Sequence, residues 1–130
     1  MKYYYNTTLE NKDFDEVIDL VTAHLKEEGF GVLTEIDVKS TLKKKLDVDF
    51  KKYRILGACN PEFAHKALQA EDKIGVLLPC NVIVEENDNG SIEVSAVDPV
   101  TSMGAVENDK LNNIAGEVRS RLQKVIKELN

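Results

Sequence analysis

The chain has 130 residues, of which 42% are hydrophobic and 31% are charged, and its formal net charge at pH 7 is −6. These values fit a single folded domain over residues 1–130, and the acidic balance argues against a nucleic-acid partner, whose phosphates attract basic proteins. The start of the chain lacks the apolar core of a signal peptide, and no stretch has the roughly 20 apolar residues of a membrane span, so we expect a cytoplasmic protein with reduced thiols and no membrane partner.

The first half of the sequence alternates between strand and helix signals. Aromatic and β-branched residues predict a strand over residues 3–8. A variant of the capping box and apolar residues at helical spacing predict a helix over residues 13–29. A second strand is expected over 31–36, a short helix over 38–46 and a third strand over 52–59.

The second half predicts a short helix, two hairpin strands and a long helix. The short helix covers residues 61–70, and a long apolar strand, interrupted by a proline, covers 74–85. A turn at 87–90 leads to an alternating strand over 91–97. The helix over 109–129 has apolar residues every three or four positions. We expect it to pack against the sheet of its own chain, the alternative being an intermolecular coiled coil.

The order of these elements predicts the fold class. A mainly antiparallel sheet could be covered on one face by the two longest helices, and no linker, repeat or low-complexity segment divides the chain. The sequence therefore predicts a single compact α+β domain.

Two strings, Gly57–Pro61 and Leu77–Asn81, hold the only cysteines of the chain, and each places a Cys-Asn pair beside a proline. Asn60 suits a helix N-cap and Pro61 the first helical position. A helix start beside Cys59 is expected to lower the pKa of its thiol. If the two strands that carry these strings are neighbours, Cys59, Asn60, Cys80 and Asn81 form a candidate binding site.

Structural interpretations of the same residues remain open. Both cysteines can be small buried hydrophobic residues, and Asn60 can act only as a cap. Asn81 is expected to fix a bend at the neighbouring proline, the alternative being ligand contact. Asp98 is expected to cap a turn, the alternative being that it faces the cysteines as a further ligand-binding residue.

Metal and catalytic motifs are weak or missing. Glu62 and His65 lie three positions apart on the predicted short helix, and His24 precedes two glutamates on the first helix. Such spacings are common, so these residues are weak metal candidates that could catch adventitious zinc, and no cofactor is predicted. Phosphate loops, nucleophile elbows and His-Glu-x-x-His motifs are missing, which gives no support to a conventional hydrolase, kinase or dehydrogenase.

The two cysteine strings resemble the bacterial and archaeal family known as domain of unknown function 302. The resemblance implies a compact domain of the TATA-box-binding-protein-like class, with a strand, a helix, four strands and a helix, and short helices inserted. It also suggests a homodimer, but it supplies no catalytic residues, and the name of the fold does not imply DNA binding. The matching stretches are Ile36–Val38, Tyr53–Pro61, Ile74–Val82 and Val97–Pro99.

Three functions follow from these observations. The first is a noncatalytic homodimeric domain that binds a small molecule or a thiol-containing partner around Cys59, Asn60, Cys80 and Asn81. The second is a redox sensor or enzyme in which Cys59 is attacked or oxidised and Cys80 resolves it. The third is a purely structural assembly protein, in which neither cysteine has a chemical role.

Overall fold

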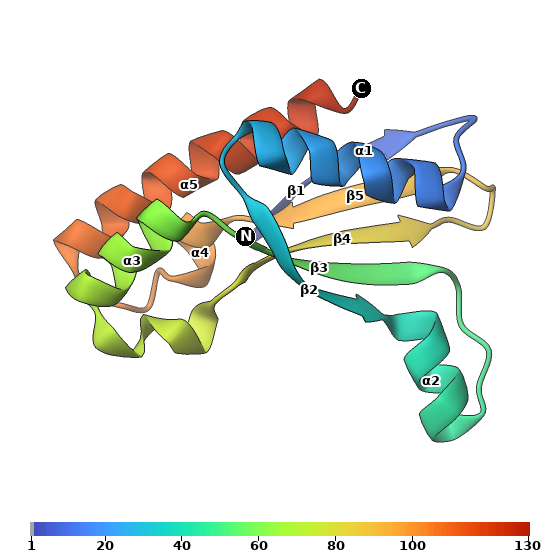
Figure 1. Cartoon of the computed structure of the whole chain (residues 1–130), viewed down its shortest axis with the longest axis horizontal. Helices are drawn as coiled ribbons and strands as arrows, with labels where there is room; N and C mark the ends of the chain where they lie inside the picture. The colour runs from blue at the N-terminus through green and yellow to red at the C-terminus, as the bar shows by residue number, and fades with distance from the viewer. Residues whose placement is uncertain (1) are drawn as a thin grey trace.

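Five strands form one antiparallel sheet in the order β1-β5-β4-β3-β2 (Figure 1). The computed structural model describes residues 2–130. Within them, no helix is both long and apolar enough to cross a membrane. The elements in chain order are β1 (Tyr4–Leu9), α1 (Phe14–Glu27), β2 (Gly31–Asp37), α2 (Val38–Leu46), β3 (Tyr53–Cys59), α3 (Pro61–Ala70), the 3-10 helix η1 (Asp72–Leu77), β4 (Cys80–Glu86), β5 (Ile92–Val97), α4 (Pro99–Ser102) and α5 (Asp109–Glu128).

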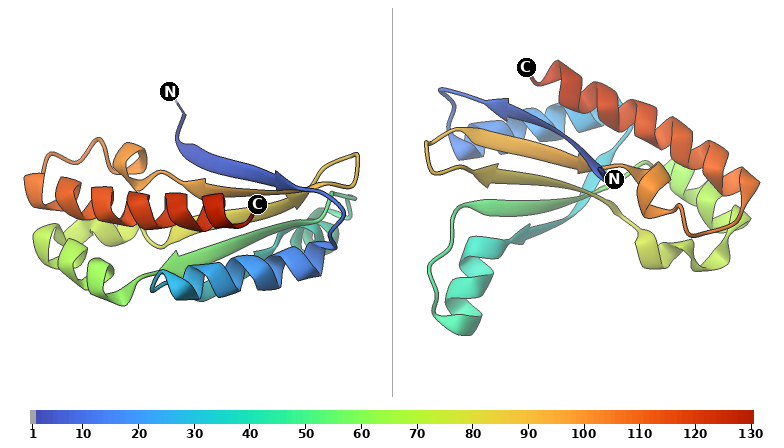
Figure 2. Two further views of the ribbon diagram at one scale, coloured as in Figure 1. Left: turned by 90° about the horizontal axis from the view of Figure 1, so that it is seen from above. Right: turned by 180° about the vertical axis from the view of Figure 1, so that it is seen from behind.

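The two long helices, α1 and α5, lie side by side on one face of the sheet (Figures 1 and 2). Their apolar positions recur at helical spacing, so each helix buries one stripe against the sheet. The expected α+β fold with both long helices on one face is confirmed, and α5 packs in its own chain. Fully buried side chains of this core include Val17, Val21 and Leu25 from α1, Val82, Val84 and Val94 from the sheet, and Leu122 and Val125 from α5.

A second, smaller apolar cluster extends the core beyond the ends of β3 and β4. Its buried members are Ala67, Ile74, Met103, Leu111 and Ala115. They come from α3, η1, the end of α4 and the first half of α5, which gather at one end of the molecule (Figure 1). Side chains of Leu78 and Ile114 pack against both clusters. The candidate site lies between these two clusters.

Two segments differ from the sequence prediction. The expected strand over 74–85 begins only at Cys80, and residues 72–77 form η1 instead. Pro79 explains the boundary, because a proline has no N–H to donate to a strand ladder. The loop expected after Asp98 contains the single turn of α4, for which Pro99 supplies the first residue.

Strand β2 and helix α2 form a projecting edge of the molecule (Figure 1). Helix α2 contains no buried residue, although the Asp37 carboxylate caps it by accepting a hydrogen bond from the Ser40 backbone N–H at 3.0 Å. Arg54 on β3 holds the adjoining end of β2 through ion pairs with Glu35, at 2.8 Å, and Asp37, at 3.5 Å. The helix is therefore held by its N-terminal cap and by the ion pairs of the adjoining strand, since none of its residues packs in the core.

Candidate functional site

A cavity of about 320 Å³ lies where β3 and β4 meet α3, α4 and α5. Among the described residues, none that line it is acidic, basic or a histidine. A hollow of about 460 Å³ near Glu10 and Glu16 is polar and open, so it would not remove an apolar molecule from water. Its lining residues include Cys59, Asn60, Phe63, Ala64, Cys80 and Met103.

Antiparallel pairing of β3 and β4 brings the two cysteine strings together. Ala58 lies opposite Cys80 in the register, so Cys59 is one position beyond this pair. Cys80 is buried, Cys59 is half-buried, and both are free thiols that line the cavity. The sequence could not choose between parallel and antiparallel pairing, and the structure shows the antiparallel one.

The environment of both thiols opposes ionisation. Burial raises the pKa of the Cys59 thiol. Burial also raises the pKa of Cys80 to about 11, and the nearby Cys59 adds to the rise. The lowered pKa expected for Cys59 is therefore not found. The reason is burial, which disfavours the charged thiolate. The Phe63 N–H at the start of α3 donates to Asn60 Oδ1, at 3.4 Å.

Asn60 uses its amide to join two helices. Besides capping α3, its Nδ2 donates to the backbone carbonyl of Glu28, just after α1, at 3.5 Å. Gly29 allows this approach, because its φ is +86° and a Cβ there would lie 2.8 Å from Asn60 Nδ2. Asn60 thus lines the cavity, and its side chain makes hydrogen bonds to the backbone at the start of α3 and at the end of α1.

Asn81 does not line the cavity, in contrast to the prediction. Successive residues of a strand point to opposite faces, so Asn81 faces away when Cys80 faces the helices. It is exposed in a surface hollow with Tyr53 and Ser95 on the uncovered face of the sheet. Its register partner is Gly57, where a Cβ would clash with Thr34 Oγ1.

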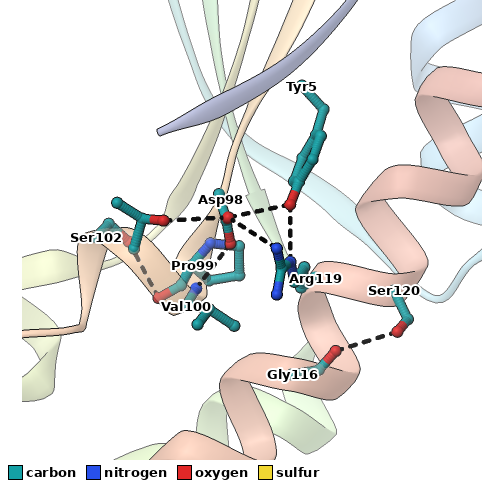
Figure 3. A network of polar contacts seen from close by, with 9 residues as sticks. Tyr5, Asp98, Pro99, Val100, Ser102, Gly116, Arg119 and Ser120 are labelled. Atoms are coloured by element: carbon teal, nitrogen blue, oxygen red, sulfur yellow. Dashed lines mark hydrogen bonds and ion pairs between the residues drawn. The ribbon is translucent and has the colours of Figure 1, made fainter. Parts of the chain in front are cut away.

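Asp98 is a cap within a polar network (Figure 3). Its Oδ1 accepts from the Val100 N–H at 3.0 Å, and its Oδ2 accepts from the Tyr5 and Thr101 hydroxyls, each at 3.1 Å. Arg119 forms an ion pair with the same carboxylate at 3.5 Å and donates from Nε to the Tyr5 hydroxyl oxygen at 2.8 Å. The buried carboxylate is fully occupied by these groups. Asp98 itself does not line the cavity, but it caps α4, whose first residue, Pro99, does.

The three weak metal candidates, Glu62, His65 and His24, do not form one site. Glu62 and His65 are exposed on α3 and join no group of three potential metal ligands within residues 2–130. His24 does join one, with Glu27 and with Glu128 from the other end of the chain. Sequence spacing could not identify Glu128. The sequence analysis also missed the apolar residues that line the cavity, because the sequence does not show which apolar residues of a helix or loop face a cavity and which face the core.

Comparisons with known proteins agree with the resemblance carried by the cysteine strings. A family model described as "Domain of unknown function DUF302" matches residues 5–129. An uncharacterized protein from Aquifex aeolicus (strain VF5) is 26% identical over 96 residues, which cover 74% of this chain and 60% of that relative. The match thus spans less than two thirds of the length of that relative. The crystal structure of an uncharacterized conserved DUF302 protein from Bacillus stearothermophilus has a TM-score of 0.91 and 27% identity, with 100% of both chains covered.

Proposed function

The chain belongs to the DUF302 family, and we propose that it is a noncatalytic domain that binds a small, neutral, mainly apolar molecule in the cavity beside Cys59 and Cys80. The observation that carries this proposal is the chemistry of the lining. Among the described lining residues, the two thiols are the only titratable groups, and burial raises the pKa of both.

An uncharged ligand is favoured because a buried charge needs a partner that this lining does not supply. The volume of about 320 Å³ lies at the lower end of the range of small-molecule sites, roughly 300–1,000 Å³. Protonated thiols are weak hydrogen-bond donors that otherwise behave as small apolar groups. Affinity would therefore come mainly from apolar surface removed from water.

A redox sensor or thiol enzyme has less support from the same site. The thiolate is the nucleophile in such chemistry, and the raised pKa of Cys59 reduces the thiolate fraction at neutral pH. No acidic or basic side chain among the described lining residues could act as a general acid or base. Binding without catalysis needs neither a thiolate nor a general acid or base, and so it fits this lining better than thiol chemistry does.

A cavity-filling substitution tests the binding proposal. We expect the neutral fluorescent probe N-phenyl-1-naphthylamine to bind the wild-type protein saturably, with one probe per chain. Ala64→Leu places three additional carbon atoms in the wall of the cavity and should weaken probe binding at least tenfold. Fluorescence titration measures this effect, and circular dichroism checks that the fold is retained.

Ala23→Leu is the matched control, because Ala23 is an exposed residue of α1 and does not line the cavity. The control should bind the probe as the wild type does. Equal probe affinity in the wild type and Ala64→Leu would place the probe elsewhere and contradict the proposal.

We also propose that a second copy of the chain is the partner of β2 and α2. Large apolar side chains are exposed on this edge, with Leu33 at 69%, Ile36 at 47% and Leu46 at 66%. Residues 38–52 contain six lysines and two aspartates, a net charge of +4 in a chain of −6, so the remaining residues carry −10. The positive charge of residues 38–52 in one copy is complementary to the negative charge of the rest of another copy. A strand edge with unpaired backbone groups is a ready template for a further chain.

Light scattering on a sizing column tests this partner. The wild type is expected at twice the mass of one chain, with dissociation favoured as salt screens the charges. Leu46→Asp should shift the protein to the monomer. Val76→Asp, at a residue 84% exposed on η1, is the control and should leave the mass unchanged. A wild-type monomer at 100 μM protein, or a Leu46→Asp dimer as stable as the wild type, would contradict the proposal.

A further inference from the structure

The last turns of α1 and α5 bring together an imidazole and two carboxylates. The two helices run antiparallel side by side (Figures 1 and 2). Glu28 lies beside Arg121 and Lys124, and His24 lies beside Glu128. The His24 Nδ1 lies 3.6 Å from Glu27 Oε2 and 3.8 Å from Glu128 Oε2. One ligand atom from each of these three residues lies within 4.8 Å of the others.

The imidazole nitrogen in this group is unusual. His24 Nδ1 is buried and has no hydrogen-bond partner among the described residues. The nearby Lys124 ammonium pairs with Glu28, at 3.2 Å, and with Glu128, at 4.0 Å, and makes no hydrogen bond to His24 among the described residues. Buried polar atoms normally have a partner, and those that lack one point to a missing ion, water or ligand.

We infer that His24, Glu27 and Glu128 form a binding site for a divalent transition-metal ion, with Zn²⁺ as the best match. Zinc binds histidine nitrogen and carboxylate oxygen at about 2.0–2.2 Å, so two ligands of a tetrahedral site lie roughly 3.3 Å apart. The two spacings to His24 Nδ1, 3.6 and 3.8 Å, exceed this value by a few tenths of an ångström, and the two carboxylate oxygens lie within 4.8 Å of each other. The side chains of Glu27 and Glu128 are 64% and 40% exposed and so are free to move closer.

Charge and ligand type support the same ion. Two carboxylates balance the two charges of the metal, and the C-terminal ends of helices attract cations. The imidazole favours zinc over magnesium or calcium, which prefer oxygen ligands alone. Three protein ligands leave the fourth position for water. An ion bound here would connect α1 to α5, so metal binding should also raise the melting temperature of the protein.

The test is zinc binding to the metal-free full chain, measured by competition with a chromogenic chelator. We expect one Zn²⁺ per chain, at least tenfold weaker binding in each of the variants His24→Gln and Glu128→Gln, and a zinc-dependent rise in melting temperature that both variants lose. His65→Gln is the matched control, because it changes the only other histidine of the chain, and it should bind as the wild type does. Lys124→Gln should bind zinc more tightly, since it removes a competing cation.

Cobalt distinguishes this site from the thiols. Co²⁺ bound at His24 should give visible d–d bands without the strong near-ultraviolet absorption of a thiolate ligand, and these bands should persist in Cys59→Ser. Zinc binding that is equal in the wild type and His24→Gln would mean an adventitious ion only and would overturn the inference. Binding that is lost in Cys59→Ser but kept in His24→Gln would likewise overturn it, by assigning the metal to the cavity.

Discussion

Replacing Asp98 with alanine is expected to lower the free energy of unfolding by about 3 kcal/mol, as the combined loss of a cap and of charge-assisted hydrogen bonds. The carboxylate is buried and accepts hydrogen bonds from Val100, Tyr5 and Thr101. Alanine would leave these donors without their acceptor. The ion pair with Arg119 adds little, because that side chain is 41% exposed. Urea unfolding followed by circular dichroism measures the change.

Two further variants show whether the effect comes from this network. Asp98→Asn keeps an oxygen that can accept from the Val100 N–H, so it should lose about half as much stability as alanine. Asp19→Ala removes an exposed carboxylate that has no hydrogen bond or ion pair among the described residues, and it should change stability by less than about 0.5 kcal/mol. A loss below about 1 kcal/mol in Asp98→Ala would contradict the structural role given to this carboxylate.

Raising the pH from 9 to 11 is expected to remove about 2 kcal/mol of stability through Cys80 alone. The pKa of this thiol is raised from its ordinary value of 9.0 to about 11 in the folded protein, mainly by burial. Between these values the unfolded thiol has lost its proton and the folded one retains it. The unfolded state then binds fewer protons, so stability falls as the pH rises, and the contribution is fully present only below pH 9.

The difference between the wild type and Cys80→Ala isolates this contribution, because tyrosines and lysines titrate in both proteins over the same range. The stability difference should shrink as the pH rises from 9 to 11. Cys59→Ala is the matched control, and the half-buried Cys59 should contribute less. Parallel stability curves for the wild type and Cys80→Ala would show that Cys80 is not protected in the way the structure indicates.

The structure confirms the cap predicted at the first Cys-Asn pair and corrects the prediction for the second. For Cys59 and Asn60, the local signals were sufficient to predict the cap, since an N-cap depends on residues within one turn. For Cys80 and Asn81, the position within the strand decides the outcome. Adjacent strand residues point to opposite faces, so only one of the two can reach the cavity.

The sequence by itself determined most elements of this protein and its fold class, because apolar spacing, caps and turn residues act locally. The bounds of α2, the start of α3 and the buried stripe of α5 all follow from such signals. Only the tertiary structure decided the pairing of Ala58 with Cys80, the raised pKa of both thiols and the approach of Glu128 to His24. These depend on strand register, on burial and on contacts between distant parts of the chain, for which no local pattern codes.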